Sequence, residues 1–286
     1  LMTTLNAFGN PTSPDDINIE LKEITKWLKV NYLMLNADKT KSMFFFHANK
    51  RVHFPSLELD GHSIERVESF NYLGITVNQH LSWTPHVNSI SNKITKVTGI
   101  LTKLKHILPQ TVLLTIYNSL IACHLSYGIL VWGSKIDSIF KLQKKAVRVI
   151  TLSRRNSHTD PIFLKLGILK IADIRKQSEL KFYYKLVQNS LPVYFLHRFI
   201  TMHNMIHQHH TRQQQNLLLP QFRREYARTS LRYTLANTVN HTPNNIKDKI
   251  HTHSFKGFSD YIKRYFLLNY NQTCNVPNCR SCRSSR

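Results

Sequence analysis

The chain has 286 residues, a hydrophobic content of 42% and a formal net charge of +23 at pH 7. This composition is that of a globular protein with a sizeable buried core, and it does not fit wholesale disorder. The sequence has no apolar run of the roughly 18 residues that a membrane span needs. It opens with no secretory signal pattern, and its four cysteines are too few for a disulfide framework. We therefore expect an intracellular protein of the nucleus or the cytoplasm that is neither secreted nor inserted in a membrane.

The positive charge is concentrated after residue 80. Residues 1–80 hold 8 Lys/Arg and 9 Asp/Glu, a net charge of −1. Residues 81–150 hold 9 and 1, a net of +8, and residues 151–286 hold 22 and 6, a net of +16. Because each Lys or Arg at a phosphate releases counterions, this distribution favours a back part that binds a polyanion such as a nucleic acid. The alternative is charge that serves solubility alone.

One helix and several strands are predicted in the first 80 residues. Ser13 or Asp15 can cap a helix that ends at Asn31. A short apolar run predicts a buried strand at residues 43–46. An alternation around an Asp-Gly pair predicts a hairpin at 57–64. A second apolar stretch predicts another strand at 70–77.

After residue 80 the apolar period changes from 2 to about 3.5, which is typical of helices. The pattern predicts an amphipathic helix with lysines on its outer faces at residues 87–108 and a more apolar, buried helix at 111–123. It also predicts a third, basic helix at 137–150 and a long later helix at 171–189. A polar stretch at 201–216 predicts a loop or linker. The sequence thus predicts an α+β fold, with antiparallel hairpins in a small N-terminal part and a mostly helical remainder.

Short phrases follow one another in a fixed order along the chain. They are Trp27-Leu28-x-x-Asn31-x-Leu33-x-Leu35-Asn36-x-x-Lys39-Thr40, Asn71-Tyr72-Leu73-Gly74, Leu81-x-Trp83-x-x-His86, Ser126-Tyr127-Gly128 with Trp132-Gly133, and Leu142-Gln143-Lys144-Lys145-x-x-Arg148. This order resembles the back half of the reverse transcriptase of jockey-like, LINE-like non-LTR retrotransposons, over roughly residues 15–265. Several phrases in one order are more specific than any one of them alone.

The resemblance implies an RNA-directed DNA polymerase, a nucleotidyltransferase that copies RNA from a DNA primer end with two Mg²⁺ ions. It implies the end of the palm at 1–80, a helical thumb at 81–150 and a basic helical C-terminal region with a Cys-rich tail at 151–286. RNA, DNA and an RNA–DNA hybrid are the implied partners. The family's aromatic-Ala-Asp-Asp phrase is absent from this sequence. We therefore expect an N-terminally truncated fragment that is inactive alone, because metal-driven phosphoryl transfer needs those carboxylates. The alternative is a stand-alone basic nucleic-acid-binding protein, derived from such an element and without enzymatic activity.

The resemblance also assigns two sites in the palm. Lys39 corresponds to the palm lysine that approaches the triphosphate, where its charge or its proton would assist the leaving pyrophosphate. A surface turn with a solvated lysine is the alternative. Tyr72, Leu73 and Gly74 fall where the family has the primer grip, a hairpin that holds the primer 3′ end, and a glycine there allows close approach of a nucleic-acid strand.

Basic side chains of the predicted thumb are candidate contacts to the template–primer backbone, which such residues recognise by shape rather than by sequence. Each can equally be the solvated face of an ordinary helix. The candidates are Lys93, Lys96, Lys103, Lys141, Lys144, Lys145 and Arg148.

Adjacent acids near the N-terminus allow two interpretations. Asp15 and Asp16 open the predicted helix, where carboxylates favour the positive helix end, so we expect a capping role. A metal-dependent nuclease using them with Glu20 and Glu23 is the other interpretation, but these acids fall along a single helix.

Three cysteines near the C-terminus, Cys274, Cys279 and Cys282, have a spacing that suits part of a Zn²⁺ site. They are one ligand short of a closed structural site, which His251, His253 or a residue beyond Arg286 would complete. The alternative is a terminus with free thiols.

Overall fold

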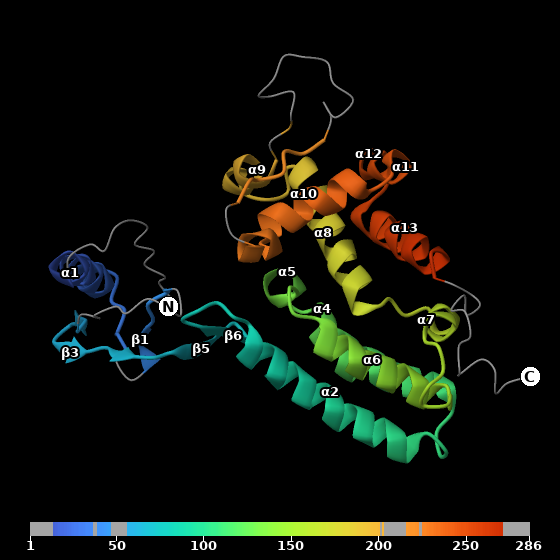
Figure 1. Ribbon diagram of the computed structural model, residues 1–286. Coiled ribbons are helices and arrows are strands. Elements are labelled where there is room, and N and C mark those ends of the chain that lie inside the picture. Colours follow the sequence, from blue (N-terminus) through green and yellow to red (C-terminus); the bar gives the residue numbers. More distant parts are fainter. Residues whose placement is uncertain are drawn as a thin grey trace, which may run out of the picture. The chain divides into compact units, whose positions relative to one another are not determined.

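The computed structural model describes residues 14–36, 39–46, 56–200, 202, 216–222 and 225–270. The chain divides into two compact units, residues 1–86 and 87–286 (Figure 1). The α+β composition, mostly helical, is confirmed. In the part of the chain that the structure describes, no helix is long and apolar enough to cross a membrane. The functional division at residues 80 and 150 stays a prediction.

In the first unit, helix α1 (Pro14–Val30) packs on the hairpin of β2 (Glu58–Leu59) and β3 (His62–Ser63). Its buried core consists of Leu21, Leu57 and Leu59. Asp60 and Gly61 form the predicted turn with φ angles of 52° and 76°, and this left-handed pair is the conformation that two-residue hairpin turns favour.

The end of α1 lies where the sequence predicts it. Tyr32 N–H donates to Lys29 O and Leu33 N–H donates to Leu28 O, at 3.1 and 2.9 Å. This pair of bonds is a Schellman motif, which satisfies the last carbonyl groups of a helix. It places Tyr32 in the left-handed region with φ 54°.

The predicted strand at 43–46 is wrong in its bounds. The paired strand is β1 (Lys41–Ser42), which pairs in parallel with β4 (Glu65–Arg66). Residues 43–46 continue without strand pairing, and Phe46 N–H donates to Gln79 O at 3.2 Å. An apolar run predicts a strand covered on both faces, but Phe45 is 57% exposed here.

The single strand predicted at 70–77 is wrong, whereas the hairpin that the resemblance implies at Tyr72, Leu73 and Gly74 is present. It consists of β5 (Ser69–Tyr72) and β6 (Ile75–Asn78), paired antiparallel. Leu73 and Gly74 form the turn with φ angles of 47° and 78°. Local residue preferences alone do not predict this turn, because Leu73 is an apolar residue at a position that usually holds Asn, Asp or Gly.

The second unit is helical. Helix α2 (Thr84–Leu104) begins in the first unit and continues into the second. Helices α3 (Gln110–Tyr117) and α4 (Cys123–Ser126) are joined without a break by the π-helical turn η2 (Asn118–Ala122). Every fourth residue of this long helix is buried, namely Leu113, Tyr117, Ile121 and Leu125. The expectation of a buried helix is correct for this side only, because the opposite side is exposed, with Leu120 45% exposed.

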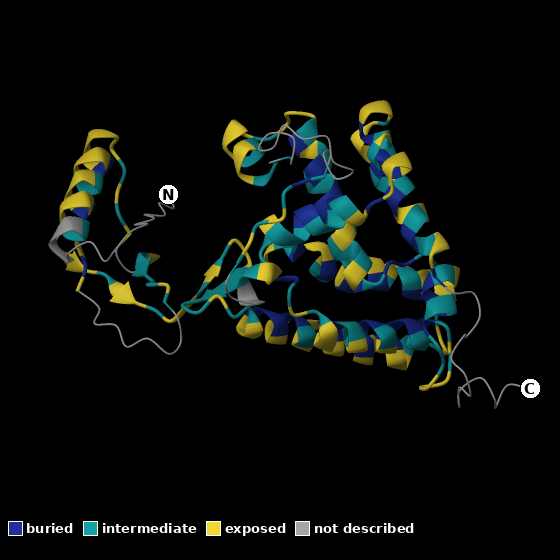
Figure 2. Ribbon diagram, turned by 45° about the horizontal axis from the view of Figure 1, so that its top comes forward, coloured by how far each residue is buried: buried dark blue, intermediate teal, exposed yellow. Residues whose placement is uncertain are grey.

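Helix α8 lies at the centre of the second unit. It contacts α4, α5, α6, α9, α10 and α13. Figure 2 shows buried residues on the inward sides of these helices and exposed residues on their outer faces. The bounds of the remaining elements are α5 (Ile129–Trp132), α6 (Asp137–Ile150), α7 (Asp160–Leu166), α8 (Ile171–Val187), α9 (Val193–Phe199), η4 (Glu225–Thr229), α10 (Leu231–His241), α11 (Asn244–Lys247), α12 (Lys249–Thr252) and α13 (Phe255–Leu268). The predicted helix at 137–150 is confirmed as α6, and most of 201–216 lies outside the described residues.

Candidate nucleic-acid interface

Helix α6 has one buried face and one basic face. Its buried residues are Ile139, Gln143, Ala146, Val147 and Ile150. At 3.6 residues per turn, Lys141 and Lys145 fall on the opposite side, where both are exposed. Lys144 lies at the flank, and both Lys144 and Arg148 are half-buried. The predicted basic residues of the last phrase therefore gather on one surface.

Gln143, which belongs to the same phrase, is fully buried and holds α6 in place. Its Nε2 donates to Tyr117 Oη at 3.0 Å and to Leu169 O at 2.9 Å. Its Oε1 accepts from the backbone N–H of Ile171 at 2.9 Å. Burial raises the pKa of Tyr117 to about 12, although the Gln143 hydrogen bond opposes this shift, so the phenol stays neutral. Gln143 thus ties α6 to α3 and to the start of α8.

Lys144 and Arg148 take part in the fold as well as in the basic surface. Lys144 Nζ lies 4.2 Å from the centre of the Phe140 ring, a cation–π contact. Arg148 Nε donates to Ser157 O at 2.9 Å, and burial lowers the pKa of Arg148. Of the predicted contacts on α6, Lys141 and Lys145 are therefore the side chains most open to a ligand.

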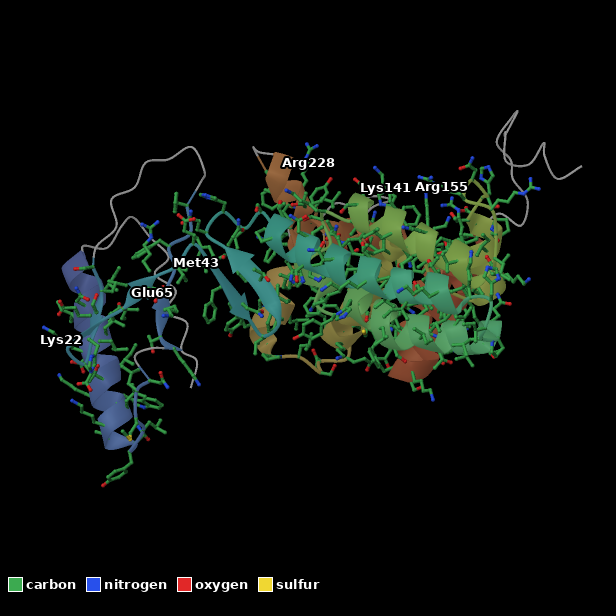
Figure 3. All side chains as sticks on the ribbon, turned by 90° about the horizontal axis from the view of Figure 1, so that it is seen from below. Lys22, Met43, Glu65, Lys141, Arg155 and Arg228 are labelled. Atoms are coloured by element: carbon green, nitrogen blue, oxygen red, sulfur yellow. The ribbon has the colours of Figure 1, made fainter. Side chains whose placement is uncertain are left out.

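The bond from Arg148 also holds the loop after α6 against that helix. This loop carries Arg154 and Arg155, both exposed. Figure 3 shows Lys141 and Arg155 pointing to the same side of the helical unit. The sequence-based prediction did not include Arg155. The feature that could have identified it is the Arg154-Arg155 pair directly after a basic helix. We call the set Lys141, Lys144, Lys145 and Arg155 the α6 basic face.

The three predicted lysines of α2 are exposed. Ile90, Ile94 and Leu101 form the buried side of this helix. Lys96 and Lys103 lie opposite that side, and Lys93 lies at its edge. Burial, and then the ammonium group of Lys93, lower the pKa of His124 on α4. Lys93 therefore lies at the edge of α2 toward α4.

The hairpin of β5 and β6 carries the Tyr72-Leu73-Gly74 phrase. Leu73 is 68% exposed at the tip of the turn, and Tyr72 is half-buried. Thr76 N–H donates to Nδ1 of His86 at 3.2 Å, and His86 is 5% exposed in the first turn of α2. The Trp83-x-x-His86 phrase thus connects the hairpin to the start of α2. The role of the phrase as a primer grip stays a prediction.

Lys39 is exposed on a turn. Its backbone N–H donates to Asn36 Oδ1 at 3.1 Å, and Thr40 Oγ1 donates to Asn36 O at 2.8 Å. Asn and Thr side chains commonly make such bonds to nearby backbone groups outside helix and strand interiors. This arrangement fits the surface-turn alternative and leaves the ammonium group accessible to a ligand. The catalytic role of Lys39 stays a prediction.

The Trp132-Gly133 phrase is part of the core. Trp132 is fully buried and its Nε1 donates to Tyr127 O at 2.8 Å. Arg175 of α8 donates to Gly133 O at 2.7 Å, and it also contacts Glu179 at 3.2 Å between Nε and Oε1. A Cβ atom at Gly133 would lie 2.3 Å from Ile129 O. This phrase therefore joins α5 to α8 in the core of the second unit.

The predicted metal ligands are only partly described. Cys274, Cys279 and Cys282 lie outside the described residues. Asp15 and Asp16 lie in the first turn of α1, and Glu23 pairs with Lys26 at 2.6 Å. Among the described side chains, no three His, Cys, Asp or Glu form a group that could hold a metal ion.

Comparison with known proteins gives a similarity in sequence. No family model matches the chain, and no solved structure matches it. The chain is 27% identical over 161 residues to the RNA-directed DNA polymerase from mobile element jockey of Drosophila melanogaster. The match covers 54% of this chain and 17% of that protein, so the chain spans only a small part of its relative. This similarity confirms the resemblance to the reverse transcriptases of jockey-like non-LTR retrotransposons.

Proposed function

We propose that this chain is a C-terminal, template–primer-binding part of a jockey-like RNA-directed DNA polymerase. The observation that carries the proposal is the α6 basic face, which points away from the buried side of α6. An RNA–DNA hybrid is the ligand that we propose for this face. The exposed Lys93, Lys96 and Lys103 of α2 would add further contacts to phosphate groups.

The way in which α6 is held supports this role. Gln143 fixes the helix from its buried side, and Arg148 fixes the following loop. A surface held in this way loses less conformational entropy when it binds than one on a mobile segment. Lysines that meet phosphates carry no base information, so binding would depend on duplex shape and on salt, and little on sequence.

We further propose that this chain does not extend a primer by itself. In the parent enzyme, Mg²⁺ ions held by carboxylates would supply the charge stabilisation for phosphoryl transfer. Lys39 and the hairpin of Tyr72, Leu73 and Gly74 would act beside that centre, and the cysteine tail would bind Zn²⁺. With these partners and reactions, the protein would act inside the cell, in the nucleus or the cytoplasm.

Binding of a labelled RNA–DNA hybrid, followed by fluorescence anisotropy over a range of salt concentrations, tests the interface. The variant Lys141→Gln/Lys145→Gln should bind about tenfold more weakly, and its salt dependence should fall by roughly 2 in log–log slope, because two phosphate contacts are lost. Lys22→Gln/Lys176→Gln removes the same charge at exposed positions on α1 and α8 and should bind like the unaltered chain. Equal loss in both variants would overturn the α6 interface.

A second candidate is a stand-alone nucleic-acid-binding protein without chemistry. It is favoured by the second unit, which has its own core around α8 as well as the α6 basic face. Primer extension with Mg²⁺ and deoxynucleotides, with this chain alone and with a polymerase segment that carries the palm aspartates, separates the two roles. Extension restored by that segment supports the polymerase part, and binding without any restored extension supports the stand-alone role. Extension by this chain alone would contradict both.

A further inference from the structure

Helices α8 and α13 pack against each other along a defined seam. Gln177 Nε2 donates to Ser259 O at 3.0 Å, and Tyr184 Oη donates to His253 O at 2.9 Å, just before α13. The rings of Tyr184 and Phe258 lie 5.1 Å apart. The side chains beside this seam are therefore held in fixed relative positions.

Four lysines gather along this seam. Lys181 and Lys185 lie one turn apart on α8, and Lys256 and Lys263 lie two turns apart on one side of α13. Lys181 is close enough to Lys263 for the two charges to interact. Lys185 reaches the start of α13, where its Nζ lies 5.1 Å from the centre of the Phe255 ring. We call Lys181, Lys185, Lys256 and Lys263 the α8–α13 lysine cluster.

This cluster carries more positive charge than the fold compensates. Asp260 is the carboxylate that acts on Lys181, and none of the four lysines forms an ion pair within 4.0 Å with another described residue. Burial lowers the pKa of Lys181, Asp260 opposes that shift, and Lys263 adds to it by less than Asp260 opposes it. Asp260 is one carboxylate beside four ammonium groups, so an anionic ligand would meet an excess of positive charge here.

An aromatic ring accompanies the lysines. Phe255 is 40% exposed although it is one of the larger apolar side chains of α13. The Tyr184 ring supports it from α8, with ring centres 5.6 Å apart. Lysines beside an exposed, supported ring are the combination by which proteins hold unpaired strands, since the ring stacks on a base and the ammonium groups meet phosphates.

We propose that the α8–α13 lysine cluster, with Phe255, binds a single nucleic-acid strand at a site separate from the α6 basic face. This inference rests on the proposed function, because it takes nucleic acid as the ligand of the chain. The strand's phosphodiester groups would lie along the lysines of both helices. One unpaired base would stack on the exposed part of the Phe255 ring.

Binding of a short fluorescent single-stranded RNA to the full chain tests the site. Lys185→Gln/Lys263→Gln should weaken binding about fivefold and reduce the log–log salt slope by about 1.4, because contacts to single strands release fewer counterions than those to duplexes. The matched control, Lys176→Gln/Arg264→Gln, removes two charges from the same helices at exposed positions outside the cluster and should leave binding unchanged. Equal binding by the two variants would overturn the proposal.

Phe255→Leu gives a second measurement with a different signature. It should weaken binding about tenfold, within the range of one lost base–aromatic contact, while the salt slope stays unchanged. Circular dichroism checks that the variant remains helical. A change in the slope, or unaltered affinity in a folded variant, would remove the stacking part of the proposal. Stronger retention of the chain on anionic lipid vesicles than on RNA, lost in Lys185→Gln/Lys263→Gln, would overturn it in favour of a membrane surface.

The two interfaces fail in distinguishable ways. If the α6 variant binds the hybrid normally while the cluster variant loses single-stranded RNA, the proposed α6 interface is wrong and the further inference stands. If the α6 variant loses the hybrid while the cluster variant binds single-stranded RNA normally, the further inference is wrong and the proposed function stands.

Discussion

The two units of the chain are built in different ways. The first unit rests on short two-stranded sheets and a core of Leu21, Leu57 and Leu59. The second surrounds α8 with helices and places hydrogen-bonded polar side chains, among them Gln143, in its interior. Isolated two-stranded pairs are marginal in water, whereas a core with satisfied polar groups specifies one arrangement. The helical unit is therefore the part we expect to hold a rigid binding surface.

Backbone strain follows the same division. Of the described non-glycine residues with positive φ, Tyr32, Asp60, Leu73, Leu81 and Trp83 belong to the first unit, and Leu152 and Asn189 to the second. Each such residue costs on the order of 1 kcal/mol relative to an unstrained backbone. The shorter unit thus carries more strain on a smaller core, which is a reason to test its stability separately.

The largest effect is expected when the buried polar network of the helical unit is broken. Gln143→Ala would leave the Ile171 N–H and the Leu169 carbonyl without their partner and would open a cavity. We expect a loss of about 4 kcal/mol in the free energy of unfolding. Urea denaturation followed by circular dichroism measures it. Gln110→Ala, at an exposed position of α3, is the control and should change the stability by less than about 0.5 kcal/mol. Similar values for both variants would show that the network does not organise this unit.

A pair of glycines tests how tightly the end of α5 is packed. Gly133→Ala places a methyl group 2.3 Å from Ile129 O within α5 and 3.2 Å from Arg175 Cδ of α8, so we expect a loss of about 2 kcal/mol in the free energy of unfolding. Gly99→Ala on α2 meets nothing within 4 Å and should raise the stability by up to about 1 kcal/mol, because alanine favours the helix. Thermal unfolding of both variants should therefore give shifts of opposite sign. Two shifts of the same sign would contradict the packing at Gly133.

In both units the sequence predicts features that depend on nearby residues, and it does not predict those that depend on distant segments. The bounds of α6 follow from its apolar period, and the Asp60-Gly61 turn follows from local residue preferences. The strand at 43–46 is wrong because strand pairing depends on distant segments. The burial of Gln143 is equally hidden, since its partners Tyr117 and Ile171 lie 26 and 28 residues away. Lysines on a helical period are visible in the sequence, but their grouping between α8 and α13 requires the packing of two helices.

The smallest predicted effect concerns the strained tip of the β5–β6 hairpin. Leu73 has φ 47°, so Leu73→Gly should stabilise the first unit by about 1 kcal/mol through relief of strain. Urea denaturation followed by tryptophan fluorescence measures this, because Trp83 is next to the hairpin in the sequence. Tyr72→Phe, which keeps the turn residues, is the control and should not raise the stability.

Binding of the RNA–DNA hybrid by Leu73→Gly tests whether the strained residue Leu73 takes part in nucleic-acid binding. Non-glycine residues in this conformation persist where the surrounding structure or a function requires their side chains. If Leu73 only closes a turn, Leu73→Gly should bind the hybrid as tightly as the unaltered chain. If the exposed side chain contacts a nucleic-acid strand, as the predicted primer grip requires, the stabilised variant should bind more weakly. A gain in stability together with a loss in affinity would mark this hairpin as a functional element in a weakly built unit.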